Sequence, residues 1–135
     1  MAFSFMTTKK SFFDSYIPAI TWWFVVLILM CTPGKDLPEL GSWTELISLD
    51  KLIHVGVFGL LAYLFMRPVA IKDFTVAIKK QTFLKIAIAA SIWGLTLELV
   101  QHFWIPGRSM DLMDFVADAI GCALAYIYSK RYLIK

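Results

Sequence analysis

The sequence predicts an all-α, integral membrane four-helix bundle with both termini on the cytoplasmic side (N-in/C-in). Hydrophobic residues make up 59% of the 135 residues, only 17% are charged, and the hydrophobic residues concentrate in four long runs. A typical soluble domain has about 45–50% apolar and about 25% charged residues. We therefore expect a single membrane domain over residues 1–135, with no room for a second domain of ordinary size.

The four apolar runs predict four membrane-spanning helices. A helix needs about 20 residues, with a range of roughly 17–25, to cross the hydrocarbon core of a bilayer. Several runs reach that length only when their polar ends are included, which indicates polar ends packed inward at membrane depth. The predicted spans are residues 16–32, 51–67, 83–104 and 112–129.

The first run follows Lys9 and Lys10, as the apolar part of a signal peptide would. It has no small-x-small cleavage site before Pro33, so we interpret it as a retained membrane helix. The turn at Pro33-Gly34 ends this helix, and the turn at Pro106-Gly107 ends the third.

The distribution of Lys and Arg predicts the orientation of the spans. Ten of the 13 basic residues lie in the N-terminal tail, the loop between the second and third spans, and the C-terminal tail. Cytoplasmic segments of membrane proteins are enriched in Lys and Arg. We therefore expect these three segments in the cytoplasm, which places the loops after the first and third spans outside.

Polar side chains gather at the outer end of three predicted helices. A charge at the centre of a membrane helix costs about 3 kcal/mol, so such residues indicate function by default. The members of this polar cluster are Asp50, Lys51, His54, Glu98, Gln101, Arg108, Asp111, Asp114 and Asp118.

The spacing of these residues turns them inward. Asp50 and His54 are four residues apart and share one helix face. Asp111, Asp114 and Asp118 line one face of the fourth helix. That face continues with small residues, Gly121 and Ala125, which let membrane helices approach closely.

Three of these side chains are expected at similar depths. At about 1.5 Å per residue, His54, Glu98 and Asp118 lie about 6–10 Å below the outer boundary. Because they come from three different helices, we predict a polar pocket that opens to the outer surface.

The pocket contains more acids than bases, since five carboxylates face Lys51, Arg108 and His54. Not all five can be buried, ionised and unpaired, so some must pair, hold a proton or bind a metal ion. The candidate acid–base residues are His54, Asp50, Glu98 and Asp118. The candidate binding residues are Lys51, Gln101, Arg108, Asp111 and Asp114. If a metal ion binds, we expect Glu98, Asp114 and Asp118 to hold it, with Mg²⁺ as the candidate.

Structural alternatives stay open for individual members. Asp111 and Asp114 also suit the positive N-terminal end of the fourth helix, with Ser109 as its cap. His54 is either a satisfied buried histidine or a base oriented by Asp50.

Arg108 is either an anchor at the membrane interface or a bidentate binding residue for phosphate or carboxylate. The whole cluster also fits a salt-bridge network that holds four short helices together.

Two motifs resemble the VanZ-like family of small membrane proteins. The first is Asp50-Lys51-x-x-His54. The second contains Glu98, Gln101, Pro106, Arg108, Asp111, Asp114, Asp118 and Gly121. The resemblance covers residues 50–126 and agrees with a four-span topology. Two positions depart from the family pattern, because Asp118 stands where Asn is common and Val55-Gly56 stand where bulkier residues are usual.

The resemblance implies a multi-pass protein of the bacterial cell (inner, cytoplasmic) membrane. The family is named after a protein associated with resistance to teicoplanin, so the resemblance implies a link to the cell envelope and antibiotic resistance. It does not imply a reaction, because function is carried by sites and not by folds.

Three function classes follow. The first is a protein that binds or modifies an anionic envelope lipid or glycan precursor, such as a polyprenyl phosphate, with Lys51 and Arg108 on the headgroup. The second is a non-enzymatic accessory or scaffold protein. The third is a small transporter, which would need to form a homo-oligomer. The partners expected are the lipid bilayer and another membrane protein or copy, with no nucleic acid. Whether the protein is an enzyme stays open, since Ser109 is the single obvious nucleophile.

Overall fold

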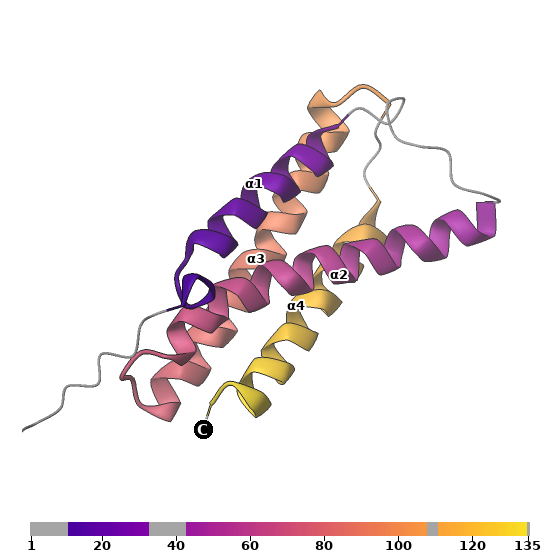
Figure 1. Ribbon diagram of the computed structural model, residues 1–135. Helices are drawn as coiled ribbons and strands as arrows, with labels where there is room; N and C mark the ends of the chain where they lie inside the picture. Colours follow the sequence, from indigo (N-terminus) through magenta and orange to yellow (C-terminus); the bar gives the residue numbers. More distant parts are fainter. Residues whose placement is uncertain (1–10, 33–42, 108–110, 135) are drawn as a thin grey trace, which may run out of the picture.

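The computed structural model describes residues 11–32, 43–107 and 111–134, and all regular structure in these residues is helical. The elements are a short 3-10 helix η1 (Phe12–Asp14) and the helices α1 (Ile17–Cys31), α2 (Trp43–Ala70), α3 (Val76–Trp104) and α4 (Leu112–Tyr132) (Figure 1). Three helices are long and apolar enough to cross a membrane, and α1 is a shorter apolar helix. The predicted membrane helical bundle is confirmed; its N-in/C-in orientation stays a prediction.

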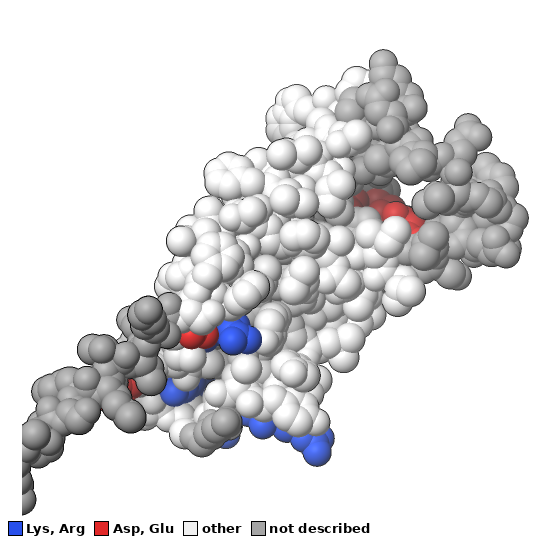
Figure 2. Space-filling view, in the orientation of Figure 1, with Lys and Arg blue, Asp and Glu red and all other residues white. Residues whose placement is uncertain are grey.

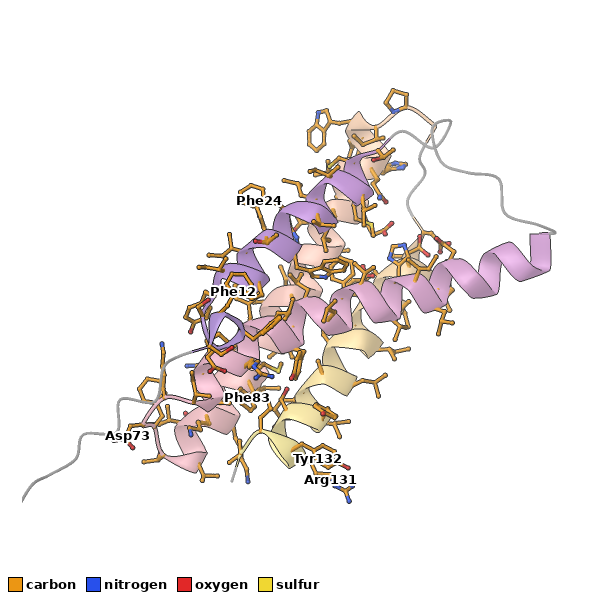
Figure 3. The ribbon with its side chains drawn as sticks, viewed as in Figure 1. Phe12, Phe24, Asp73, Phe83, Arg131 and Tyr132 are labelled. Atoms are coloured by element: carbon orange, nitrogen blue, oxygen red, sulfur yellow. The ribbon has the colours of Figure 1, made fainter. Side chains whose placement is uncertain are left out.

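The helices form a bundle in which α2 and α4 pack together most extensively. α1 packs on α2 and α3, while α4 also packs on α3 (Figure 1). Phe83 is fully buried inside the bundle, whereas Phe24 projects outward from α1 and is 53% exposed (Figure 3). Such apolar side chains on the outer faces suit contact with lipid, because a helix apolar all round is typical of a membrane span.

Charged side chains lie at the two ends of the bundle. On the face shown in Figure 2, acidic atoms appear toward one end, basic atoms with a few acidic ones gather at the other, and a wide uncharged band lies between the two ends. At the basic end, Arg67 pairs with Asp14 at 3.5 Å and donates to the Tyr63 hydroxyl at 3.2 Å. This distribution fits a molecule whose middle lies in hydrocarbon.

Three helices are longer than the predicted spans: α2 begins at Trp43 and not at residue 51, α3 begins at Val76, and α4 ends at Tyr132 and not at residue 129. α2 ends at Ala70, beyond Pro68, because Val69 and Ala70 are buried and the Lys79 ammonium donates to the Ala70 carbonyl at 2.7 Å. α3 begins seven residues before the predicted residue 83, where the Thr75 hydroxyl caps it by accepting from the Ile78 N–H.

α1 is held to the bundle by a small set of side chains. The Trp22 indole donates to the Val57 carbonyl of α2 at 3.0 Å. The Trp23 ring stacks on Trp93 of α3 at 5.0 Å between centroids, which agrees with the mid-span position of Trp93. These contacts position α1 beside the bundle and leave the contact between α2 and α4 free of it.

α2 and α4 meet backbone to backbone at two glycines. A Cβ on Gly59 would lie 3.1 Å from the Gly121 carbonyl oxygen, and one on Gly121 would lie 2.9 Å from the Gly59 nitrogen. The close approach expected at Gly121 is therefore present. Both helices run from the polar end toward the middle of the bundle. His54 lies five residues before Gly59, and Asp118 lies three residues before Gly121, so this contact brings the two side chains to the same level.

Candidate functional site

The centre of the polar cluster is a buried pair formed by His54 of α2 and Asp118 of α4. His54 Nδ1 lies 2.7 Å from Asp118 Oδ1, and the two residues are 5% and 1% exposed. Gly94 of α3 makes room for this pair, because a Cβ there would lie 2.6 Å from Asp118 Oδ2. The sequence suggested that Asp50 orients His54, but the carboxylate in hydrogen-bonding distance is that of Asp118.

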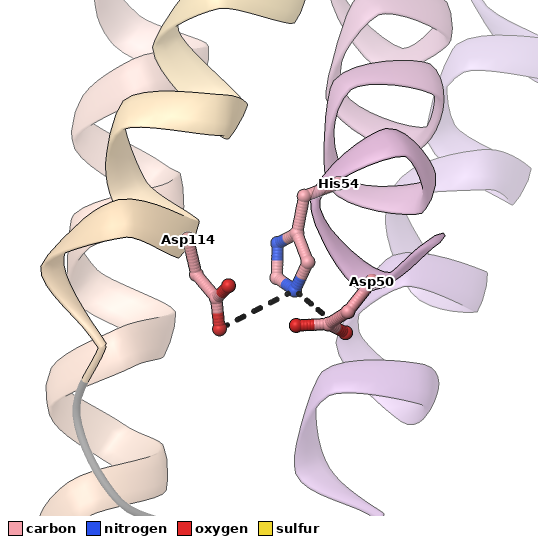
Figure 4. Close-up of side chains that lie close together, drawn as sticks. All are labelled: Asp50, His54 and Asp114. Carbon is pink, nitrogen blue, oxygen red and sulfur yellow. Dashed lines mark ion pairs between the residues drawn. The ribbon is translucent and has the colours of Figure 1, made fainter. Parts of the chain in front are cut away.

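The other nitrogen of the imidazole faces two further carboxylates. His54 Nε2 lies 3.9 Å from Asp50 Oδ1 and 3.7 Å from Asp114 Oδ2 (Figure 4). The Asp50 side chain is 52% exposed, whereas that of Asp114 is 14% exposed. The imidazole of His54 therefore lies between the buried carboxylate of Asp118 and the carboxylates of Asp50 and Asp114, of which Asp50 reaches the surface.

Lys51 joins α2 to the first turn of α4. Its ammonium donates to Asp111 Oδ2 at 2.7 Å and to Asp114 Oδ1, and it lies 3.8 Å from Asp50. Asp111 is the N-cap of α4, since its carboxylate accepts from the Met113 N–H at 2.9 Å. Asp111, and not Ser109, therefore caps the helix; Ser109 lies outside the described residues.

The ammonium of Lys51 holds the pKa of the Asp111 carboxyl below its usual range. A lowered pKa stabilises the folded state above the unfolded pKa, and this contribution is lost as the pH falls through the folded value. We expect Asp111→Asn to flatten the acid limb of stability, measured as thermal midpoint in detergent between roughly pH 6 and pH 3. Lys51→Met should flatten the same limb. The expected change in stability is modest, because the Asp111 side chain is half exposed and solvent screens its ion pair. If the acid limb of stability were unchanged in both variants, the ion pair of Lys51 with Asp111 would not stabilise the fold.

Glu98 of α3 joins the same site. It is 1% exposed, and Glu98 Oε2 accepts weakly from the Asp111 N–H at 3.4 Å. Glu98, His54 and Asp118 each offer an oxygen or nitrogen, and these atoms lie within 4.8 Å of one another. The three side chains expected at similar depth are thus brought together from three helices, and none of them faces lipid.

One predicted member, Gln101, stands apart from the cluster. The Gln101 amide donates to the Met30 carbonyl of α1 at 2.6 Å and is buried there, so it anchors α1. Arg108 lies outside the described residues.

The structure divides the predicted metal ligands between two groups within the described residues. Asp114 groups with Asp50 and His54, whereas Glu98 and Asp118 group with His54 from the other side. The sequence did not name His54 as a ligand, yet it belongs to both groups. Carboxylate oxygens suit Mg²⁺, and a mixture of imidazole and carboxylates also suits transition metals.

The geometry suits proton transfer as well. If Asp118 is ionised, it accepts the Nδ1–H of a neutral His54 at 2.7 Å. That tautomer leaves a lone pair on Nε2, which faces the exposed end of the site. A carboxylate that orients an imidazole in this way is the arrangement of many general bases.

Sequence reasoning missed Gly94 and Gly59 as residues that shape the site. Gly94 lies one turn before Glu98 on the same face of α3, and a glycine costs up to about 1 kcal/mol in a helix relative to alanine. Gly94 shares a face of α3 with the polar residue Glu98. A glycine at such a position was the available signal that a side chain of another helix, here Asp118, packs tightly against it.

The residues brought together here come from both motifs of the VanZ-like resemblance, and a family model, VanZ/LLP1, matches residues 2–134. The chain belongs to the VanZ/LLP1 family. The His54–Asp118 pair and the Lys51 contacts are therefore the internal geometry of a VanZ/LLP1 bundle.

Among curated proteins, this VanZ/LLP1 chain is similar to an uncharacterised protein of fission yeast, Schizosaccharomyces pombe. The two are 37% identical over 90 residues, which cover 64% of this chain and 52% of that relative. The chain thus spans about half of its relative's length. No solved structure matches. Since the relative is eukaryotic, the similarity does not assign the chain to bacteria.

Proposed function

We propose that the polar cluster binds the headgroup of a membrane lipid or lipid-linked glycan precursor and that His54 acts there as acid or base. The observation that carries the proposal is the 2.7 Å pair of His54 and Asp118, almost fully buried, with the second ring nitrogen facing exposed Asp50. Buried ionisable groups in a membrane protein are costly and usually functional. A lipid headgroup is the polar ligand that reaches this depth without leaving the membrane.

An anionic headgroup would bind through a divalent cation. Lys51 is already engaged by Asp111 and Asp114, and the described groups of the site are mostly acidic. Mg²⁺ is commonly held by one or two carboxylates together with the phosphates of a substrate. Asp50 and Asp114 are suited to this role, since they lie on the exposed side of His54 and leave its Nε2 beside the headgroup.

Native mass spectrometry of the detergent-solubilised protein with phosphatidic acid and MgCl₂ tests this binding. We expect the wild-type protein to retain both lipid and Mg²⁺, and the variant Asp50→Asn/Asp114→Asn to lose both. Asp14→Asn is the matched control, because Asp14 pairs with Arg67 at the other end of the bundle. Equal retention of lipid and Mg²⁺ by all three proteins would contradict the proposed site.

A scaffold function is the second candidate. The observation in its favour is that the described contacts of the cluster tie helices together: Lys51 of α2 to Asp111 and Asp114, and Glu98 of α3 to the start of α4. A scaffold predicts that Asp118→Asn, Asp50→Asn and Lys51→Met lower the amount of folded protein in the membrane. A binding site predicts that at least Asp50→Asn folds normally and loses its ligand.

We also propose the finer location that the sequence predicts, a bacterial cytoplasmic membrane with both termini inside. The Lys and Arg distribution supports the orientation, and the VanZ-like motifs support an envelope role. Fluorescent-protein and alkaline-phosphatase fusions at the C-terminus distinguish the two orientations. A role in glycopeptide susceptibility is tested by the teicoplanin sensitivity of a bacterial strain that expresses wild type or Asp50→Asn.

A further inference from the structure

An apolar groove runs along the side of the bundle, between α2 and α4. Its volume is about 480 Å³. α2 lines it with Gly56, Gly59, Leu60 and Tyr63, and α4 lines it with Leu124 and Tyr128. Its polar side-chain atoms are the two tyrosine hydroxyls, and that of Tyr63 already accepts a hydrogen bond from Arg67. The groove therefore suits an occupant that needs no hydrogen bonds.

The groove starts directly below the polar cluster. Its first lining residue is Val55, which follows His54 in α2 and lies one helical turn after Lys51. It ends where the rings of Tyr63 and Tyr128 meet, with 5.9 Å between their centroids. A molecule that fills the groove thus has one end beside charged groups and the other end against aromatic rings.

The length of the groove matches one leaflet of a bilayer. Val55 and Tyr63 are eight residues apart, so the groove is about 12 Å long. The hydrocarbon core of a bilayer is about 30 Å thick, so one leaflet contributes about 15 Å. A helix that packs along the full span would extend well beyond a groove of this length.

At Gly56, the floor of the groove is helix backbone that no side chain covers. Gly56 is exposed, and a Cβ built on it meets no atom within 4 Å. Gly59, by contrast, is a glycine because the backbone of α4 lies against it. Nothing within the described protein fills the space over Gly56, which is the space that a side chain at this position would take from an occupant.

We propose that this groove holds a hydrocarbon chain of the lipid whose headgroup binds at the polar cluster. This inference rests on the proposed function and extends it, because it makes the ligand an amphiphile with its chain on α2 and α4. A headgroup held at the cluster keeps its own chain at high effective concentration beside the groove. Close van der Waals packing then favours the groove over the surrounding lipid.

Photochemical crosslinking in vesicles tests the assignment. The probe is phosphatidic acid with a photoreactive diazirine in its acyl chain, with Mg²⁺ present, and labelled residues are mapped by mass spectrometry. We expect strong labelling of Leu60 and Leu124, compared with the lipid-facing reference residues Phe24 and Ile28 of α1. Gly56→Leu should lower groove labelling to the reference level. Ala89→Leu on the exposed face of α3 is the matched control and should leave it unchanged.

Three outcomes separate the possibilities. Equal labelling of groove and reference residues by wild type, or no effect of Gly56→Leu, would overturn the groove assignment. A lower oligomer mass of Gly56→Leu in detergent would also overturn it, because the groove would then receive a second copy. If diacylglycerol with the same chain labels the groove as strongly as phosphatidic acid, and Asp50→Asn/Asp114→Asn has no effect, the headgroup site is wrong while the groove assignment stands.

Discussion

Replacing His54 with alanine is expected to destabilise the folded bundle by about 3 kcal/mol, because it leaves the buried Asp118 carboxylate without its hydrogen-bond donor. Asp118 is 1% exposed and has His54 Nδ1 at 2.7 Å. Without the imidazole, a carboxylate stays inside the membrane bundle with a cavity beside it. The loss is measured from unfolding in mixed micelles with increasing sodium dodecyl sulfate, followed by tryptophan fluorescence.

The double variant His54→Ala/Asp118→Ala is the control for that experiment. It removes the carboxylate together with its partner, so we expect it to be destabilised by less than the sum of the two single variants. A coupling free energy between neighbours of about 0.5–3 kcal/mol is usual. Strict additivity would show that the two side chains do not depend on each other.

Asp118→Asn separates stability from function at the same position. The amide oxygen of Asn can still accept the Nδ1–H of His54, and Asn is the residue that the family resemblance expects there. We therefore expect this variant to fold more like wild type than His54→Ala does. A loss of ligand binding in this folded variant would assign the negative charge of Asp118 to function.

Gly121→Ala is expected to be the most disruptive of the small substitutions. The new Cβ would lie 2.9 Å from the Gly59 nitrogen and closer still to the Val55 carbonyl oxygen, so α2 and α4 would have to separate. Overpacking of this kind typically costs about 1–3 kcal/mol. Separation of these helices would also lengthen the contact between His54 and Asp118, so we expect ligand binding to weaken together with stability.

Gly56→Ala is its matched control. Both substitutions replace a glycine within a membrane helix, and both gain up to about 1 kcal/mol from the lower conformational freedom of alanine. Only the Gly121 substitution meets backbone, because a Cβ on Gly56 has no atom within 4 Å. We expect the same unfolding assay to show Gly56→Ala at or above wild-type stability. Parallel shifts of the two variants would mean that the glycine contact does not set the spacing of α2 and α4.

The helices and the inward direction of the polar cluster could be predicted from the sequence, because both depend on local periodicity. Asp111, Asp114 and Asp118 share a face by spacing alone. The choice of Asp118 over Asp50 as the partner of His54 could not be predicted. It depends on the register of α4 against α2, which the contact of Gly59 with Gly121 determines across about sixty residues of chain.

Gln101 shows a second limit of spacing arguments. It lies three residues after Glu98, which rotates its side chain by roughly 60° around the helix axis. That rotation is small enough to suggest a shared face, yet large enough to direct Gln101 to α1 while Glu98 faces α4. Only the position of a third helix decides between the two, and a single sequence does not contain it.

The shortness of α1 has a consequence for the lipid around the protein. Its 15 residues extend about 22 Å, against about 30 Å for an average hydrocarbon core. Near its end, the Gln101 amide donates to the Met30 carbonyl and the Thr32 hydroxyl donates to the Ile28 carbonyl. Two of the terminal carbonyls of α1 are therefore satisfied within the protein, which favours an end of α1 below the membrane surface. Lipids beside α1 must then shorten or tilt, whereas those beside the 29-residue α3 need not. The bundle therefore has one thin and one thick side, and hydrophobic mismatch gives it an orientation relative to its neighbours in the plane of the membrane.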